Sequence, residues 1–139
     1  AIMAIVALAT VMDLSGIIAT LAQSIVDLTG GSYVFLAPVI GALGTFVTGS
    51  DTNSNILFGK LQTIAASKLN IDPNWLAAAN TSGATGGKMI SPQSIAIAVS
   101  ATKMEGQANQ IMSGTMKYCC AYIVILGLKV GLFYYWFMA

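Results

Sequence analysis

Apolar residues fill most of this chain, and a few polar interruptions divide it into segments. Residues 1–30 form one apolar run, which is longer than the roughly 20 residues that a helix needs to cross a bilayer. A second run closes the chain at residues 111–138, and its aromatic series from Phe133 to Trp136 is typical of a membrane interface. The pattern therefore predicts an all-α membrane protein with a spanning helix at each end.

Residues 33–69 are apolar at both ends and polar in the middle, where the sequence from Gly49 to Asn55 is GSDTNSN. The arm at residues 33–48 is short for a full crossing. In the arm at 56–69, one helical face holds Leu57, Leu61, Ile64 and Ala65. Two such arms around a polar tip predict a re-entrant hairpin. A complete crossing followed by an interfacial helix is the alternative, and hydropathy alone does not separate the two.

Two helix starts lie close together within residues 73–102. Asp72 and Ser91 are each followed by proline, and a capping residue followed by proline is a strong signal for the first turn of a helix. The helices that these signals predict end near Asn80 and Thr102, so each is about half as long as a crossing requires. Together they predict one broken helix.

The break in this helix is polar and rich in glycine, since residues 80–94 are NTSGATGGKMISPQS. Unpaired backbone at membrane depth is tolerated only inside protein or beside a watery cavity, and broken helices are typical of the binding sites of secondary transporters. A surface loop of a soluble protein is the alternative. It fits the composition poorly, because only 8% of the residues are charged, 56% are hydrophobic and the mean hydropathy is +0.78, against roughly 25% charged in soluble domains.

The charged residues and cysteines exclude several partners. The net charge is +1 and the chain has no histidine, so we expect no nucleic acid partner and no metal site. Cys119 and Cys120 are neighbours in an apolar run, where a disulfide between them would be strained. We interpret them as packing residues, with palmitoylation as the alternative.

Three motifs for enzymes or ions are incomplete. The phosphate-loop spacing at residues 82–89 lacks its first glycine and the hydroxyl residue after its lysine. The start of a calcium loop at residues 51–55 lacks the glycine and the closing glutamate. Lys88 and Ser91 have the spacing of a serine–lysine pair, but Ser91 is better used as a helix cap. We therefore expect no enzyme activity and no cofactor.

Two charges fall inside the predicted spanning helices. A carboxylate at the bilayer centre costs about 2.5–3.5 kcal/mol, so Asp13 should face the protein interior or a cavity, unless it lies nearer an interface. Lys129 lies close to the aromatic end of its helix. We expect its amine to reach the interface rather than to take part in transport.

Two long stretches resemble a known family. TGSDTNSNILFG at residues 48–59 and LAAANTSGATGGKMISPQSIAIA at residues 76–98 are very similar to the bacterial lactate/glycolate permease family, and residues 12–16 and 37–44 are similar more loosely. Members of that family are several times longer, and the resemblance covers their C-terminal portion. It implies that this chain, which opens without methionine, is a fragment or one part of a split transporter.

The family in turn resembles the wider ion-transporter superfamily, whose fold has two inverted repeats, each with a re-entrant hairpin and a broken helix. The resemblance implies that this chain is one such half, and that a missing N-terminal repeat or a second chain completes it. The residues Ser50 to Thr52 resemble the Ser-Asn-Thr signature of a hairpin tip, with Asp51 in place of asparagine. Residues 107–116 depart from the family, which puts a role of the last helix in doubt.

The hairpin tip and the break of the helix together predict one binding pocket. Free backbone N–H groups, the helix start at Ser91 and the charge of Lys88 would favour a carboxylate there. The alternatives are that Lys88 snorkels to the membrane interface or forms a structural ion pair with Asp51 or Asp13. The candidate substrate-binding residues are Thr48, Ser50, Thr52, Asn53, Asn55, Asn80, Ser82, Thr85, Lys88, Ser91 and Gln93.

The resemblance implies uptake of lactate, glycolate or a similar 2-hydroxy monocarboxylate across the bacterial inner membrane by a multi-pass protein in the lipid bilayer. Protons rather than sodium are the expected coupling ion. Because the chain has no histidine, the proton carrier in this segment should be a carboxylate, with Asp51 favoured over Asp13. A small pore-forming protein and an accessory subunit without transport of its own are the alternatives.

Overall fold

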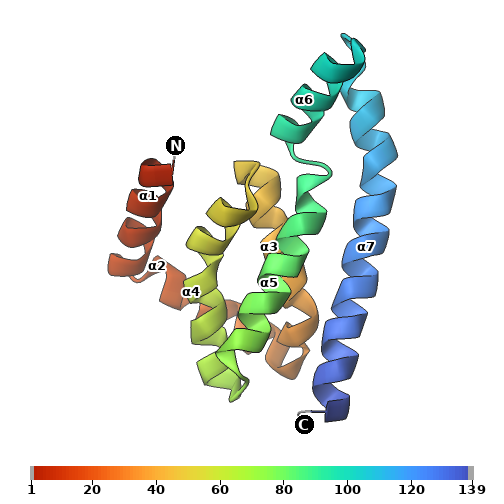
Figure 1. The fold of residues 1–139 in the computed structure, drawn as a ribbon. Helices are drawn as coiled ribbons and strands as arrows, with labels where there is room; N and C mark the ends of the chain where they lie inside the picture. The colour runs from red at the N-terminus through yellow and green to blue at the C-terminus, as the bar shows by residue number, and fades with distance from the viewer. Residues whose placement is uncertain (1, 138–139) are drawn as a thin grey trace.

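The structure is a computed structural model that describes residues 2–137, and nearly all of these residues are helical (Figure 1). The elements in chain order are α1 Ile2–Leu14, α2 Ile17–Thr29, the 3-10 turn η1 Gly30–Ser32, α3 Tyr33–Thr48, α4 Asp51–Leu69, α5 Pro73–Lys88, α6 Pro92–Thr102 and α7 Ala108–Phe137. Two segments are long and apolar enough to cross a membrane, Ile17–Thr48 and Ala108–Phe137. The all-α class predicted from the sequence is thus confirmed for the described residues.

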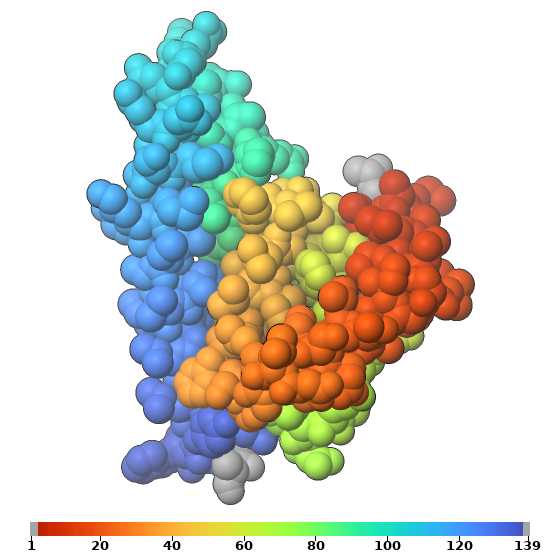
Figure 2. All heavy atoms as spheres, turned by 180° about the vertical axis from the view of Figure 1, so that it is seen from behind, coloured from red at the N-terminus to blue at the C-terminus, as the bar shows by residue number. Residues whose placement is uncertain are grey.

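The prediction of a single helix over residues 1–30 is wrong. Gly16 has a φ of 77°, in the left-handed region, and the chain changes direction there. A helix cannot continue through that conformation, and glycine adopts it without the steric penalty of a side chain. As a result α2 lies across the base of the α3–α4 pair, and α1 projects from one side of the molecule (Figures 1 and 2).

Helices α3 and α4 form a helical hairpin with a tighter turn than the sequence predicted. Only Gly49, at φ 70°, and Ser50 separate the two helices, and the side chain of Ser50 accepts a hydrogen bond from the Asn53 amide. The prediction of a seven-residue polar tip is therefore wrong, because Asp51 to Asn55 already form the first turn of α4. An N-cap serine satisfies amides of that turn and so allows the helix to start at once.

The break between α5 and α6 is real but shorter than predicted. The side chains of Asp72 and Ser91 cap their helices as expected, accepting hydrogen bonds from the amides of Asn74 and Ser94. Helix α5, however, does not end near Asn80. It continues to Lys88, so that only residues 89–91 separate the two helices.

Close packing against α3 explains why α5 stays helical through its glycines. A Cβ atom added at Gly83 would lie 1.9 Å from the carbonyl oxygen of Pro38, and one at Gly87 would lie 2.1 Å from that of Ala42. On α3, a Cβ at Gly41 would lie 1.9 Å from the carbonyl oxygen of α5 residue Asn80. The two backbones therefore touch, which is the packing that small residues allow between membrane helices.

Helix α7 begins earlier than the predicted residue 111, because the polar residues before it are already helical from Ala108 onward. It runs alongside α5 and α6 (Figure 1) and packs against α3, where Gly131 lies against the ring of Phe35. Most of its other large apolar side chains are exposed. That distribution suits a helix whose outer face contacts lipid.

Candidate functional site

The hairpin turn lies directly beside the start of α6. A Cβ atom added at Gly49 would be 2.1 Å from Oε1 of Gln93, so the turn between α3 and α4 contacts the first turn of α6. Because Ser50 caps α4 and Ser91 caps α6, this contact brings the N-termini of the two helices together. Each N-terminus carries unpaired amides and about half a positive charge. Their junction, which we call the tip junction, is therefore suited to an anion.

Three buried oxygen atoms in the last turn of α3 and the first turn of α4 have no hydrogen-bond partner within residues 2–137. They are Oγ1 of Thr45, Oδ1 of Asp51 and Oδ1 of Asn53. Buried polar atoms are nearly always paired in folded proteins, so unpaired ones indicate a place for a ligand, an ion or water. Thr45 was not predicted, and its only signal in the sequence is a hydroxyl within the apolar run of α3.

A buried network of polar side chains joins α3, α4 and α5 below this junction. The hydroxyl of Tyr33 donates to Oε1 of Gln62 (2.9 Å), and Nε2 of Gln62 donates to Oδ1 of Asn80 (3.1 Å). In turn, Nδ2 of Asn80 donates to Oδ1 of Asn55 (2.8 Å), which also accepts from the hydroxyl of Thr81 (3.1 Å). This network fixes the hairpin against α5, and sequence reasoning missed Tyr33 and Gln62.

The structure brings together most of the predicted site residues but not all. The residues that form the hairpin turn and the two helix starts at the tip junction are Thr48, Ser50, Asp51, Thr52, Asn53, Ser91 and Gln93. Asn55 and Asn80 belong to the buried network instead. Thr85 is exposed on α5, where its hydroxyl donates to the carbonyl oxygen of Thr81, and Ser82 faces α7.

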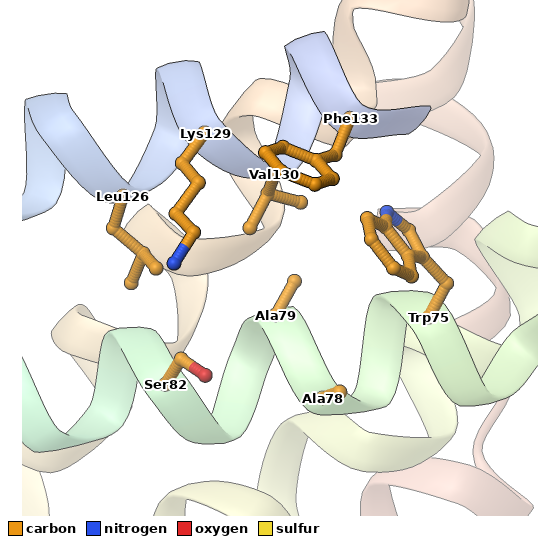
Figure 3. A pocket seen from close by; sticks show the side chains of 8 residues that line it. All are labelled: Trp75, Ala78, Ala79, Ser82, Leu126, Lys129, Val130 and Phe133. Carbon is orange, nitrogen blue, oxygen red and sulfur yellow. The ribbon is translucent and has the colours of Figure 1, made fainter. Parts of the chain in front are cut away.

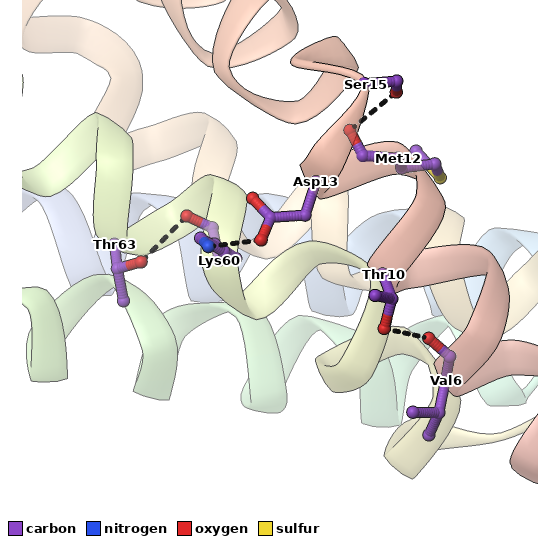
Figure 4. Close-up of polar contacts among 7 residues, drawn as sticks. All are labelled: Val6, Thr10, Met12, Asp13, Ser15, Lys60 and Thr63. Carbon is purple, nitrogen blue, oxygen red and sulfur yellow. Dashed lines mark hydrogen bonds and ion pairs between the residues drawn. The ribbon is translucent and has the colours of Figure 1, made fainter.

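Lys88 and Asp13, which the sequence offered as partners in an ion pair, have different surroundings. Lys88 is the last residue of α5 and is exposed, and no ion pair to it occurs within the described residues. Asp13 instead pairs with Lys60, with 2.5 Å between Oδ2 and Nζ, in the cleft between α1 and α4 (Figure 4). The alternative that Asp13 is the partner of Lys88 is therefore wrong. The pairing also explains how the chain holds a carboxylate in an apolar helix.

Comparison with known protein families decides what kind of protein carries this site. The profile of the L-lactate permease family matches residues 1–137. The chain belongs to this family. That result confirms the resemblance seen in the two sequence stretches.

Individual proteins similar to this chain are also permeases by name. The chain is 44% identical to the glycolate permease GlcA of Escherichia coli (strain K12) over 124 residues, which is 89% of this chain and 22% of that protein. It is 44% identical to the L-lactate permease of Bacillus subtilis (strain 168) over 117 residues, 84% of this chain and 21% of that protein. These relatives are named as permeases, which supports the prediction that the protein is not an enzyme.

The chain spans about a fifth of the length of these curated relatives. The L-lactate permease of Escherichia coli (strain K12) shows the same relation, with 42% identity over 88% of this chain and 22% of that protein. No solved structure matches the chain.

Proposed function

We propose that the tip junction is one side of the substrate site of a permease that carries lactate, glycolate or a similar 2-hydroxy monocarboxylate across the bacterial inner membrane. One observation carries the proposal, namely that the N-termini of α4 and α6 meet at Gly49 and Gln93. Two positive helix ends at one point favour a small anion. The family of the chain supplies the class of anion.

The chemistry of the junction matches both groups of a 2-hydroxy acid. The carboxylate would accept hydrogen bonds from free amides in the first turns of α4 and α6, and Lys88, at the end of α5, would add a positive charge. The unpaired oxygens of Asp51 and Asn53 are acceptors, and the substrate hydroxyl is a donor. We therefore expect the site to prefer lactate to propionate, which lacks the hydroxyl.

The helices also fit one half of an inverted-repeat transporter. In this proposal α3 and α4 form a re-entrant hairpin, α5 and α6 form the broken helix, and α7 crosses the bilayer in a multi-pass protein. Such transporters bind substrate between two repeats, so the other side of the site would come from the rest of a longer permease or from a second chain. We expect that these 139 residues alone do not transport.

Coupling to protons is proposed for Asp51. Its Oδ1 is buried and unpaired at the tip junction, whereas Asp13 is held by Lys60 in a separate cleft. The carboxylate of a bound substrate would place a second negative charge beside Asp51, which favours the binding of a proton by Asp51. By linkage, one proton would then accompany one anion.

Protection of cysteines by substrate tests this assignment. Thr52→Cys and Gln93→Cys would be introduced one at a time into a full-length permease that carries these residues, with Cys119 and Cys120 replaced by serine. Thr52 and Gln93 are both exposed, so a cysteine at either position should be accessible to the reagent. We expect lactate to slow their reaction with a membrane-permeant maleimide, and propionate to slow it much less.

Ser67→Cys is the matched control, because Ser67 is exposed on α4 about 22 Å from Thr52 at 1.5 Å per residue. Its labelling should not respond to lactate. Equal labelling rates at Thr52→Cys with and without saturating lactate would remove the tip junction from the substrate site. The chain would then be better described as an accessory or pore-forming part of the permease.

A further inference from the structure

A second cleft lies between α5 and α7, where it runs along residues 75–82 of α5 (Figure 3). Its volume is about 240 Å³. Lys129, Ser82 and Trp75 are the polar residues that line it, and its walls are apolar side chains such as Leu126 and Phe133. None of these groups takes part in the tip junction.

The ammonium group of Lys129 is the charge of this cleft. Figure 3 shows the side chain running away from Phe133 and into the space between the two helices, toward Ser82. It forms no ion pair within residues 2–137, and no acidic residue lines the cleft. Lys129 is exposed, and an exposed charge on a helix that crosses a bilayer needs an anionic partner.

Trp75 lines the end of the cleft away from Lys129 (Figure 3). Its Nε1 is buried and has no hydrogen-bond partner in the described part of the chain. The hydroxyl of Ser82 is a further donor at the cleft, while its carbonyl oxygen is occupied by the hydroxyl of Tyr122 at 3.2 Å. The cleft thus offers the ammonium group of Lys129 and the hydroxyl of Ser82 as donors and has no carboxylate in its lining, which suits a phosphate or carboxylate group.

The position of the cleft favours a lipid as the source of that anion. Trp75 lies in the first turn of α5, and the aromatic residues 133–136 lie at the adjoining end of α7, so the cleft is close to one end of the apolar region. Cationic pockets between membrane helices near an interface bind the headgroups of anionic lipids. We propose that this cleft binds the phosphate group of an anionic phospholipid. The proposal rests on the proposed membrane crossing of α7.

Lipid retention by the purified protein tests the proposal. A full-length permease carrying these residues would be reconstituted with equal phosphatidylglycerol and phosphatidylcholine and then purified, and the bound lipid would be identified by native mass spectrometry. We expect phosphatidylglycerol to be retained, and Lys129→Gln to lower its apparent affinity roughly fivefold. Lys129→Arg should retain it. Lys117→Gln, an exposed lysine at the other end of α7, is the matched control.

Two results would overturn the lipid assignment. One is equal retention of phosphatidylglycerol by the unaltered protein and by Lys129→Gln. The other is displacement of the lipid by millimolar inorganic phosphate or lactate, which would indicate a site for a free anion. Cysteine protection at Thr52 should be the same in the Lys129→Gln background. The two proposals can therefore fail separately.

Discussion

Gly83→Ala is expected to force α5 away from α3, because the two backbones touch at this residue. The added Cβ would lie 1.9 Å from the carbonyl oxygen of Pro38. Ordinary contact begins near 3.4 Å, so the helices must separate by about 1.5 Å. The three nearest atoms all belong to the backbone of Pro38, so no flexible side chain can turn aside. Overpacking of this kind costs about 1–3 kcal/mol.

The separation should also stretch the network that holds the hairpin. The hydrogen bonds from Gln62 to Asn80 and from Asn80 to Asn55 are 3.1 and 2.8 Å long, and a shift of about 1.5 Å would break at least one. A lost hydrogen bond costs about 1 kcal/mol, while alanine gains up to about 1 kcal/mol over glycine in a helix. The net expectation is a destabilisation of about 1–3 kcal/mol.

Gly114→Ala on α7 is the control for Gly83→Ala. No atom lies within 4 Å of the Cβ that it would add, so only the gain in helix propensity should remain. The assay is reversible unfolding of the 139-residue chain in mixed micelles, followed by circular dichroism. We expect the free energy of unfolding to fall for Gly83→Ala and to stay equal or rise for Gly114→Ala. Equal effects of the two substitutions would refute backbone contact between α3 and α5.

Three further substitutions test the polar residues. Asn80→Leu keeps the number of side-chain heavy atoms but leaves Nε2 of Gln62 with only its 3.4 Å hydrogen bond to the carbonyl oxygen of Ala37, and the same unfolding assay should show a loss of about 1–3 kcal/mol. Lys88→Gln in a full-length permease should weaken equilibrium lactate binding at least tenfold at normal membrane expression, and unchanged affinity would leave Lys88 without a role in binding. Asp51→Asn should abolish proton-driven accumulation of lactate while lactate exchange across the membrane continues. Accumulation that persists would turn attention to Asp13 or to the rest of the permease.

Local signals predicted the starts of helices well, because the interactions that fix them are local. A capping residue followed by proline marks α5 and α6 in the sequence, and the structure shows both caps. The end of α5 was not predictable in this way. Its glycines weaken a helix by up to about 1 kcal/mol each, and only the contact with α3 reverses that preference. At Gly16 no such contact exists, and the helix breaks there.

Contacts between residues far apart in the sequence also could not be predicted from the hydrophobic pattern. Asp13 and Lys60 are 47 residues apart in the chain, and Tyr33 and Gln62 are 29 apart. Each of these residues alone is compatible with several partners, so neither composition nor spacing selects one. The tip junction was predictable because both of its parts are interruptions of apolar segments. The cleft beside Lys129 was not, because it depends on how α7 packs against α5.

The most direct test of the account is the affinity of a full-length permease for lactate after Thr52→Asp. Thr52 is exposed in the first turn of α4, where an acidic residue suits the positive helix end and should not harm folding. The added carboxylate would take the place of the substrate carboxylate at the tip junction. We predict at least a tenfold loss of equilibrium lactate binding for Thr52→Asp and little loss for the neutral Thr52→Asn. Equal lactate affinity in the two variants would contradict the claim that the substrate binds where α4 and α6 begin.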